Sequence, residues 1–239
     1  MNGVDQEQDR VGKAVNGGFC RTRVNRGGDV TFPQGPQVQL LRESDPMSRI
    51  AIVYFSGYGH TAKLADAVAL GAGEIPGTEV VSLRIDPDGN LPEGGLEQLA
   101  TVDAIIYGSP TYMGGPAWQF KKFAESTARI WLAEGWKDKI AAGFTNSATV
   151  NGDKAITLIY FWTLSQQHGQ IWVGTGLLPA NTKANGPGDV NWSGGSVGIM
   201  AISPSDASTE EAPRTGDLET GRLAGQRVAL VTLRLRPAG

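Results

Sequence analysis

Short apolar runs alternate with helical patterns between residues 47 and 175 of this 239-residue chain. Apolar side chains recur at helical spacing between the runs, as at Leu64, Val68 and Ala72, which predicts amphipathic helices. Such an alternation favours a parallel sheet with helices on both faces and right-handed crossovers. The runs predicted as strands are 49–55, 80–85, 103–108, 140–144 and 171–174.

Two segments fall outside this alternation. Residues 1–46 have no sustained apolar period, so we expect a disordered N-terminal extension ahead of one domain that covers residues 47–239. Residues 176–221 are rich in Gly, Pro, Asn and Ser, and so long a stretch predicts a functional flap, an oligomer contact or disorder. A helical pattern returns over 223–235 and is expected to pack on the sheet.

The composition of the chain excludes several classes of function and of binding site. A net charge of -3 argues against a general nucleic-acid binder, so a small molecule is the expected partner. No apolar run approaches the roughly 18 residues that span a bilayer. The single cysteine, Cys20, excludes an intrachain disulfide and an iron–sulfur cluster and fits a reducing cytoplasm. His60 and His168 are too few for a convincing zinc site, and we predict no metal.

A glycine loop, Ser-Gly-Tyr-Gly-His-Thr at 56–61, lies between the first predicted strand and the first predicted helix. The hydroxyls of Ser56 and Thr61 and the N–H groups freed by Gly57 and Gly59 can converge on one anion. The loop lacks the Lys of a nucleoside-triphosphate loop and the glycine spacing of a dinucleotide fingerprint. A monophosphate held without a cationic side chain fits best, and the alternative is a tight turn whose glycines serve only geometry.

Two further loops follow the third and fourth predicted strands. In Gly108-Ser-Pro-Thr-Tyr-Met-Gly114, Pro110 stiffens the backbone, Tyr112 offers an aromatic edge, and the glycines permit close approach of a flat ring. The polar loop 145–152 offers backbone and side-chain amides to the edge of such a ring. Because parallel strands carry both glycine loops, a ligand is expected beyond the carboxyl ends of the first and third strands.

These segments resemble, in order, those of the WrbA-type NAD(P)H:quinone oxidoreductases of the flavodoxin-like superfamily. The loop 56–61 resembles that family's phosphate loop, and Gly108–Gly114 is similar to its Gly-Thr-Pro-Thr-Arg-Phe-Gly loop. Arg129-Ile-Trp131 looks like the Leu-Trp segment whose indole lines the quinone pocket. Trp162–Gly169 resembles a Trp-Thr-Thr-Leu-Ala-His-His-Gly stretch that ends near the flavin, and Trp192–Gly198 resembles the family's flap.

The resemblance implies a fold, a cofactor and a reaction. The fold is a flavodoxin-like three-layer α/β sandwich with a five-stranded parallel sheet in the order 2-1-3-4-5. The cofactor is FMN, and NADH or NADPH is the co-substrate in a ping-pong, two-electron hydride transfer to a quinone. A cytoplasmic homotetramer is expected, with the 176–221 flap and the loop around Trp131 as contacts.

The resemblance also implies roles for individual residues. His168 and Tyr112 are the expected catalytic donors of a hydrogen bond or proton, and Tyr58 and Trp131 are expected to contact the substrate. The residues expected to bind FMN are Ser56, Gly57, Tyr58, Gly59, His60, Thr61, Pro110, Thr111, Tyr112, Met113, Gly114, Asn146, Ser147, Ala148, Thr149, Val150, Asn151, Gln167 and His168.

The chain departs from the family's pattern at several of these positions. The family's third loop, Ser-Thr-Gly-Thr-Gly-Gly, corresponds to the bulkier segment 146–151, which leaves its ring contacts in question. Tyr112 replaces an Arg, Gln167 replaces the first of two paired histidines, and Val197 stands where the family usually has Tyr.

Other interpretations remain open. A flavodoxin-like electron carrier would use the same loops, and a flavin-free binding or regulatory module would keep the fold alone. A flavin-reductase-like protein is a further option, but its phosphate loop normally has an Arg between serines. Trp162 and His168 also have a purely structural interpretation, as residues of a buried helix and its C-terminal end.

Overall fold

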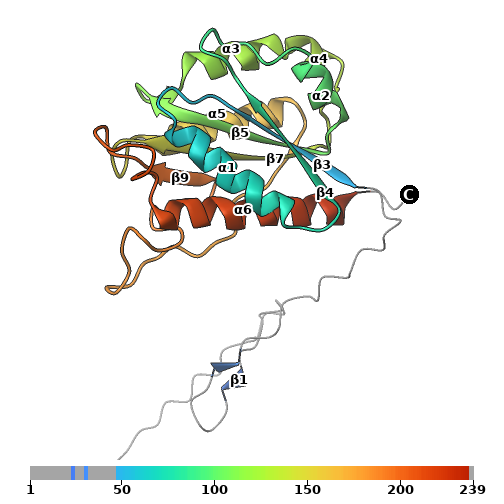
Figure 1. Ribbon diagram of the computed structural model, residues 1–239. Helices are drawn as coiled ribbons and strands as arrows, with labels where there is room; N and C mark the ends of the chain where they lie inside the picture. The colour runs from blue at the N-terminus through green and yellow to red at the C-terminus, as the bar shows by residue number, and fades with distance from the viewer. Residues whose placement is uncertain (1–22, 25–29, 32–46, 237–239) are drawn as a thin grey trace, which may run out of the picture. The chain divides into compact units, whose positions relative to one another are not determined.

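The computed structural model describes residues 23–24, 30–31 and 47–236 (Figure 1). Strands β1 (Arg23–Val24) and β2 (Val30–Thr31) pair with each other in antiparallel fashion. The remainder of the predicted N-terminal extension, Cys20 included, lies outside the described residues, so its disorder stays a prediction. The α/β fold is formed by residues 47–236.

Strands and helices alternate through residues 47–236, as the sequence predicts. The strands are β3 (Ser48–Tyr54), β4 (Thr78–Arg84), β5 (Ala104–Tyr112), β6 (Gly115–Pro116), β7 (Ile140–Ser147), β8 (Ile171–Trp172) and β9 (Ile199–Ile202). The helices are α1 (His60–Gly73), α2 (Gly95–Thr101), α3 (Trp118–Ser126), α4 (Ala128–Leu132), α5 (Lys154–Gln167) and α6 (Thr215–Leu235).

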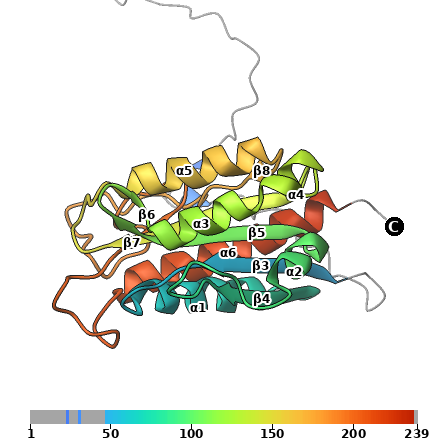
Figure 2. The same cartoon turned by 90° about the horizontal axis from the view of Figure 1, so that it is seen from above.

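The sheet order is β4-β3-β5-β7-β8, with every one of these pairs parallel (Figure 2). In order of appearance within the domain this is 2-1-3-4-5, so the predicted flavodoxin-like order is confirmed. The β3 and β5 strands lie side by side, with Ile50 opposite Ala104 and Tyr54 opposite Gly108. Their carboxyl ends, which carry the two glycine loops, therefore meet at one edge.

The fifth position of the sheet differs from the prediction, because two short strands share it. The β8 strand pairs with the start of β7, where Ile140 lies opposite Ile171, and β9 pairs with its end, where Ser147 lies opposite Ile202. The predicted strand 171–174 ends at Trp172, and the chain then passes through Gly176, whose φ is 65°. The chain returns as β9, inside the 176–221 segment predicted to be a flap.

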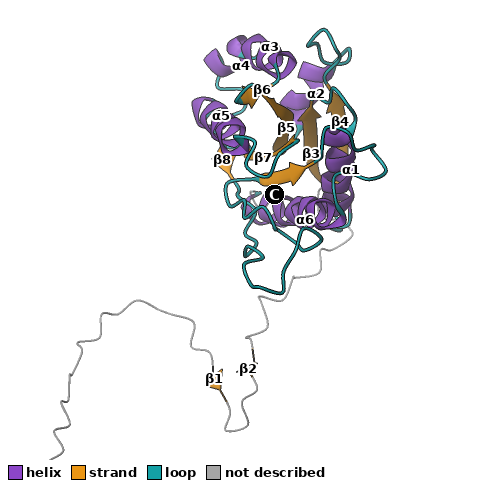
Figure 3. Ribbon diagram, turned by 90° about the vertical axis from the view of Figure 1, so that its left-hand side faces the viewer, coloured by secondary structure: helices purple, strands orange, loops and turns teal. Residues whose placement is uncertain are grey.

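Two hydrophobic cores cover the two faces of the sheet, because side chains alternate along each strand. Ile50 and Ile52 of β3 face α1 and α6, and Ala51 and Val53 face the opposite layer, which contains α2, α3 and α5. Figure 3 shows the strands between these two helical layers. The three-layer sandwich is therefore confirmed, and the predicted apolar face of α1, at Leu64, Val68 and Ala72, is fully buried.

Several other boundaries differ from the sequence-based expectation. Strand β5 continues through Tyr112 and β7 through Ser147, into segments predicted as loops. The predicted long helix after the second loop is divided at Thr127, whose hydroxyl donates to the carbonyl of Ala124 (2.7 Å). Helix α6 begins at Thr215, two turns before the predicted residue 223. Among the helices that the structure describes, none is both long and apolar enough to cross a membrane.

Candidate functional site

The loop from Ser56 to Thr61 forms a tight turn between β3 and α1. The hydroxyl oxygen of Ser56 accepts hydrogen bonds from the backbone N–H groups of Gly59 and Ala62, each at 3.1 Å. Gly59 has a φ of 92°, a conformation that favours glycine. Helix α1 begins at His60, and the first turn of a helix has N–H groups without intrahelical acceptors. The loop therefore presents donors and the positive end of a helix dipole at the sheet edge.

The second loop is a hairpin in which β5 turns back into β6. Thr111 lies opposite Pro116 and Tyr112 opposite Gly115, with Met113 and Gly114 at the turn, both at positive φ. The hydroxyl of Thr111 is hydrogen bonded to the hydroxyls of Thr145 and Thr157, each at 2.8 Å, which anchors the hairpin to β7 and α5.

Tyr58 and Tyr112 bring the two loops together. Their rings meet edge to face with 6.2 Å between centroids. Partial burial, followed by the neighbouring Tyr58, raises the pKa of the Tyr112 hydroxyl above its ordinary value. Tyr112 therefore carries its proton at neutral pH and can donate a hydrogen bond.

The third predicted loop contributes only its first part to the site. Asn146 and Ser147 belong to β7, and together with Ala148 they line the same cavity as the two glycine loops. Thr149, Val150 and Asn151 are not among the residues that line it, and Val150 is exposed. The strand carries the first two side chains because parallel pairing with β9 extends β7 through Ser147.

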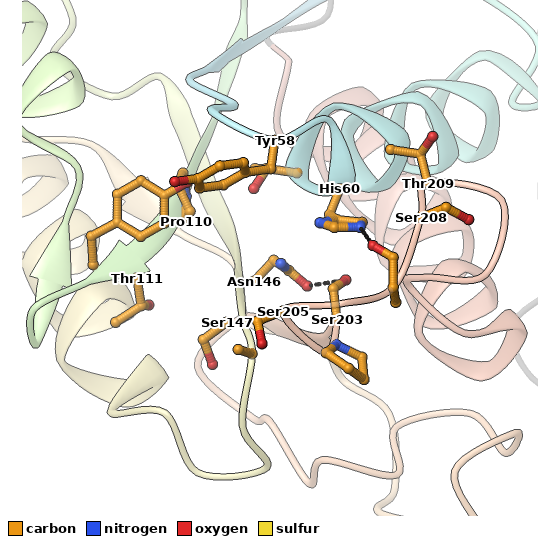
Figure 4. A pocket seen from close by; sticks show the side chains of 15 residues that line it. Tyr58, His60, Pro110, Thr111, Asn146, Ser147, Ser203, Ser205, Ser208 and Thr209 are labelled. Atoms are coloured by element: carbon orange, nitrogen blue, oxygen red, sulfur yellow. Dashed lines mark hydrogen bonds between the residues drawn. The ribbon is translucent and has the colours of Figure 1, made fainter.

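A fourth wall comes from the segment after β9, inside the 176–221 stretch predicted as a flap or oligomer contact, although none of its residues was predicted as a site residue. The Ser203 hydroxyl donates to the side-chain carbonyl of Asn146 (2.9 Å), and His60 Nε2 donates to the carbonyl of Ala207 (3.0 Å; Figure 4). Lys63 Nζ also donates to the carbonyls of Thr209 and Glu210. The one available sequence signal was a short apolar run, Ile199–Ile202, directly followed by Ser-Pro-Ser. The contributing residues are Ser203, Pro204, Ser205, Ala207, Ser208 and Thr209.

These four segments enclose a cavity of about 520 Å³ at the carboxyl edge of the sheet. Most of the residues that line it carry hydroxyl groups, and none of them is Asp, Glu, Lys or Arg. Figure 4 shows Tyr58, His60 and Thr209 on one side of this space, with Thr111, Asn146 and Ser147 on the other. The lining therefore suits a ligand that combines an anionic group with an uncharged polar or flat part.

Three other predicted site residues, Trp131, Gln167 and His168, line a different cavity of about 320 Å³. The predicted residues that line neither cavity, besides Thr149, Val150 and Asn151, are Ser56, Gly57, Gly59, Met113 and Gly114. Helix α5 starts near the end of β7 and ends near its start, where Asp138 N–H donates to the carbonyl of Gly169. Within one chain the residues of the second cavity therefore lie at the amino ends of the strands, whereas the glycine loops lie at the carboxyl ends.

His168 is held among buried groups in this second cavity. Its Nε2 is hydrogen bonded to the Thr127 hydroxyl (2.9 Å), and its ring packs on Trp136 with 4.6 Å between centroids. Burial lowers the pKa of the imidazole, so this histidine is neutral near pH 7.

Comparison with known proteins identifies the family. The chain is 49% identical over 185 residues to flavodoxin FldP of Pseudomonas aeruginosa, a match that covers 77% of this chain and 97% of that protein. A solved WrbA-like flavodoxin from Agrobacterium tumefaciens superposes with a TM-score of 0.64 at 43% identity, over 79% of this chain and 99% of the other. The chain belongs to the WrbA-like flavodoxin family.

More distant relatives of this flavodoxin-family chain include NAD(P)H dehydrogenase (quinone) of Geobacter sulfurreducens. The two are 31% identical over 204 residues, which cover 78% of this chain and 98% of that protein. A flavodoxin from the domain Archaea shares the fold at 17% identity, with a TM-score of 0.54, over 77% of this chain and 99% of the other. No protein-family model matches the chain.

Because the chain belongs to a flavodoxin family, FMN is the ligand with which the cavity is compared. A Cβ atom at Gly59 would lie 2.7 Å from the Thr209 methyl group, and one at Gly57 would lie 2.7 Å from the Tyr112 hydroxyl. Neither glycine is among the residues that line the cavity, but each lets the backbone of the loop pack directly against a side chain that does. Together with the start of α1 and the hydroxyl-rich lining, this backbone fits a phosphate monoester joined to a polar chain and a flat ring.

Proposed function

We propose that this chain is an FMN-dependent NAD(P)H:quinone oxidoreductase. The observation that carries the proposal is the single cavity bounded by two loops of different character. One end offers hydroxyls and N–H groups at the start of α1, and the other offers Pro110 and Tyr112. The resemblance to relatives named NAD(P)H dehydrogenase (quinone) supports the choice of reaction.

The residues that would hold FMN follow from this arrangement. Residues 56–61 would bind the phosphate through N–H groups and hydroxyls, and residues 110–114 would border the ring. Asn146, Ser147 and Ala148 would contact the polar edge of the cofactor, joined by Ser203 and Ser205 from the fourth wall. Thr149, Val150 and Asn151 would support this turn from behind. When bound, FMN supplies the hydride-transfer chemistry, while the chain supplies orientation and exclusion of water.

Tyr58 and Tyr112 are the residues best placed to meet a substrate. Tyr58 is 79% exposed and Tyr112 is 39% exposed, and both lie at the mouth of the cavity. Since Tyr112 keeps its proton at neutral pH, it would donate a hydrogen bond to a quinone oxygen.

His168, Gln167 and Trp131 would reach the cofactor only from a second copy of the chain. We therefore retain a homotetramer as part of the proposal. An exposed apolar row along α5, formed by Ile156, Ile159 and Trp162, supports association of copies. Size-exclusion chromatography that shows only a monomer would remove His168 and Trp131 from the proposed site and leave Tyr112 as the proton-bearing group.

The test begins with the purified full chain and FMN. Titration should give flavin absorbance bands with a protein-bound shape, and stopped-flow mixing with NADH or NADPH should bleach them. A quinone added afterwards should restore them, with a ping-pong pattern at steady state. Thr61→Val, which removes one hydroxyl from the cavity wall, should weaken FMN binding by about tenfold, the cost of a hydrogen bond to a charged group.

A second function is favoured by the 49% identity to flavodoxin FldP. An electron carrier would bind FMN equally well but would remain oxidised when mixed with NADH or NADPH, and would accept electrons only through a reductase. A chain that stays colourless with FMN would instead support a flavin-free binding or regulatory module. The two measurements in sequence separate all three functions.

A further inference from the structure

A buried lysine lies behind the wall of the proposed flavin cavity. Lys154, the first residue of α5, has no exposed surface. Its Nζ donates to the Ser147 hydroxyl oxygen at 2.8 Å and to the carbonyls of Thr149 and Val150 at 2.6 and 2.9 Å. An ammonium group has three N–H donors, so these contacts satisfy all of them.

The three acceptors belong to the turn that follows β7. Ser147 lines the cavity, and its own hydroxyl donates to the carbonyl of Thr149 (3.2 Å). Gly152 closes the turn with a φ of 53°, and a Cβ atom there would lie 1.9 Å from the Ser147 hydroxyl. The ammonium thus draws two carbonyls inward, and it is separated from the cavity by one hydroxyl group.

A buried carboxylate interacts electrostatically with the lysine. Asp217, in the first turn of α6, is 3% exposed, accepts a hydrogen bond from the N–H of Ile202 (2.9 Å) and interacts electrostatically with Lys154. Ser203, the next residue after Ile202, donates its N–H to the carbonyl of Ser147 (3.0 Å). The lysine, the turn, β9 and α6 therefore form one connected network behind the cavity.

We propose that Lys154 is a positioning residue for the bound flavin, and this inference rests on the proposed FMN binding. Its ammonium holds the turn 147–150 in the shape that meets the cofactor. Its charge also favours the reduced flavin, which is an anion near neutral pH, over the neutral oxidised form. The bulky segment 146–151 thus obtains through a lysine the local shape that glycines would otherwise permit.

The experiment compares three variants of the full chain with the wild type. Lys154→Met removes the charge at similar length, Lys154→Arg keeps it, and Lys122→Met removes an exposed lysine of α3 that donates to Asp88 and Asn90. The dissociation constants for oxidised and reduced FMN and the midpoint potential are measured, together with thermal unfolding of each variant.

Lys154→Met should weaken the binding of reduced FMN about tenfold more than the binding of oxidised FMN, which lowers a two-electron potential by about 30 mV. Lys154→Arg should restore most of the wild-type ratio between the dissociation constants for oxidised and reduced FMN, and Lys122→Met should leave that ratio unchanged. A folded Lys154→Met protein with an unchanged ratio would overturn the proposal. If the wild type binds no FMN, the proposed function fails at the first titration, before any variant is compared.

Asp217→Asn provides a second measurement if Lys154→Met does not fold. It keeps the lysine and removes the opposing charge, so the ratio should shift in the opposite direction, toward the reduced form. A shift in the same direction as that expected for Lys154→Met, or no shift, would also overturn the electrostatic role.

Discussion

Gly57 and Gly59 lie two residues apart on the same loop, yet a methyl group has a different effect at each. At Gly59 the backbone itself is strained for any other residue, since its φ is 92°, and the added Cβ would also meet the Thr209 methyl group. At Gly57 the obstacle is the hydroxyl at the end of the Tyr112 side chain, which is half-exposed and can move.

Gly59→Ala should therefore reduce FMN affinity at least tenfold, because a left-handed backbone costs a non-glycine residue about 1–3 kcal/mol. Gly57→Ala should have a smaller effect, and that effect should disappear in the Tyr112→Phe background. Fluorescence titration of FMN against the wild type, the three single variants and the Gly57→Ala/Tyr112→Phe double variant measures both. Equal losses for the two alanine variants, or no rescue by Tyr112→Phe, would contradict this account of the loop.

The two glycine loops were predictable from sequence because each depends on local geometry. One loop contains Ser56, Gly59 and Thr61, and the other contains Pro110. Each loop follows directly after an apolar strand. The Ser203–Thr209 wall was not predictable in the same way, since it reaches the cavity only because β9 pairs with β7. The position of Lys154 behind Ser147 likewise depends on how the turn folds back on α5.

Helices α1 and α6 approach so closely that their backbones nearly touch (Figure 1). A Cβ atom at Gly71 would lie 1.8 Å from the carbonyl oxygen of Arg222, and one at Gly225 would lie 2.2 Å from that of Val68. Gly73 is on the same helix as Gly71, but the nearest atom to its added Cβ is 4.0 Å away, on Val80. The helix pair therefore provides a matched comparison.

Gly71→Ala should lower the free energy of unfolding by about 3 kcal/mol or more, because overpacking against backbone cannot be relieved by a side-chain rotation. Gly73→Ala should be neutral or stabilise by up to about 1 kcal/mol, the difference in helix propensity. Urea unfolding of the two variants and the wild type gives both values. Similar destabilisation by both substitutions would show that the helices do not pack as closely as described.

At the level of elements, the sequence predicted those with a strong internal pattern and missed those defined by contacts. The apolar runs of β3 and β5 are long and bounded by turn residues, and their order in the sheet follows from the alternation with helices. The start of α6 at Thr215 lacks that pattern because Gly216 faces the neighbouring backbone and Gly221 faces side chains of α1, so neither presents an apolar side chain of its own. The division between α3 and α4 depends on the Thr127 hydroxyl bond, which spacing alone does not reveal.

At the level of the whole molecule, two buried charges make stability depend on pH in opposite ways. Burial raises the pKa of Asp217 from 3.8 to about 6, so the native state binds more protons than the unfolded state between these values. The stability that Asp217 contributes is therefore present below pH 4 and is lost as the pH rises through 6. Burial lowers the pKa of Lys154 from 10.5 to about 8, so its contribution is present above pH 10.5 and is lost as the pH falls through 8.

Asp217→Asn stays uncharged throughout and should remove the first of these dependences. The free energy of unfolding of the wild type, relative to that of the variant, should decrease by about 3 kcal/mol from pH 4 to pH 7, since one pKa unit corresponds to about 1.4 kcal/mol. Guanidinium unfolding at several pH values measures the difference. A constant difference across this range would mean that Asp217 is no harder to ionise in the folded protein than in the unfolded chain.

The split fifth position of the sheet also bears on how copies of the chain can meet. An unbroken edge strand offers a row of free backbone groups to any chain that can add a further strand. Here β8 and β9 each present only a short row, and the excursion between Val173 and Gly198 interrupts the edge. This interruption disfavours the addition of a further strand at the β8 and β9 edge, so the continuous strand β4 at the opposite edge is the longer row of free backbone groups.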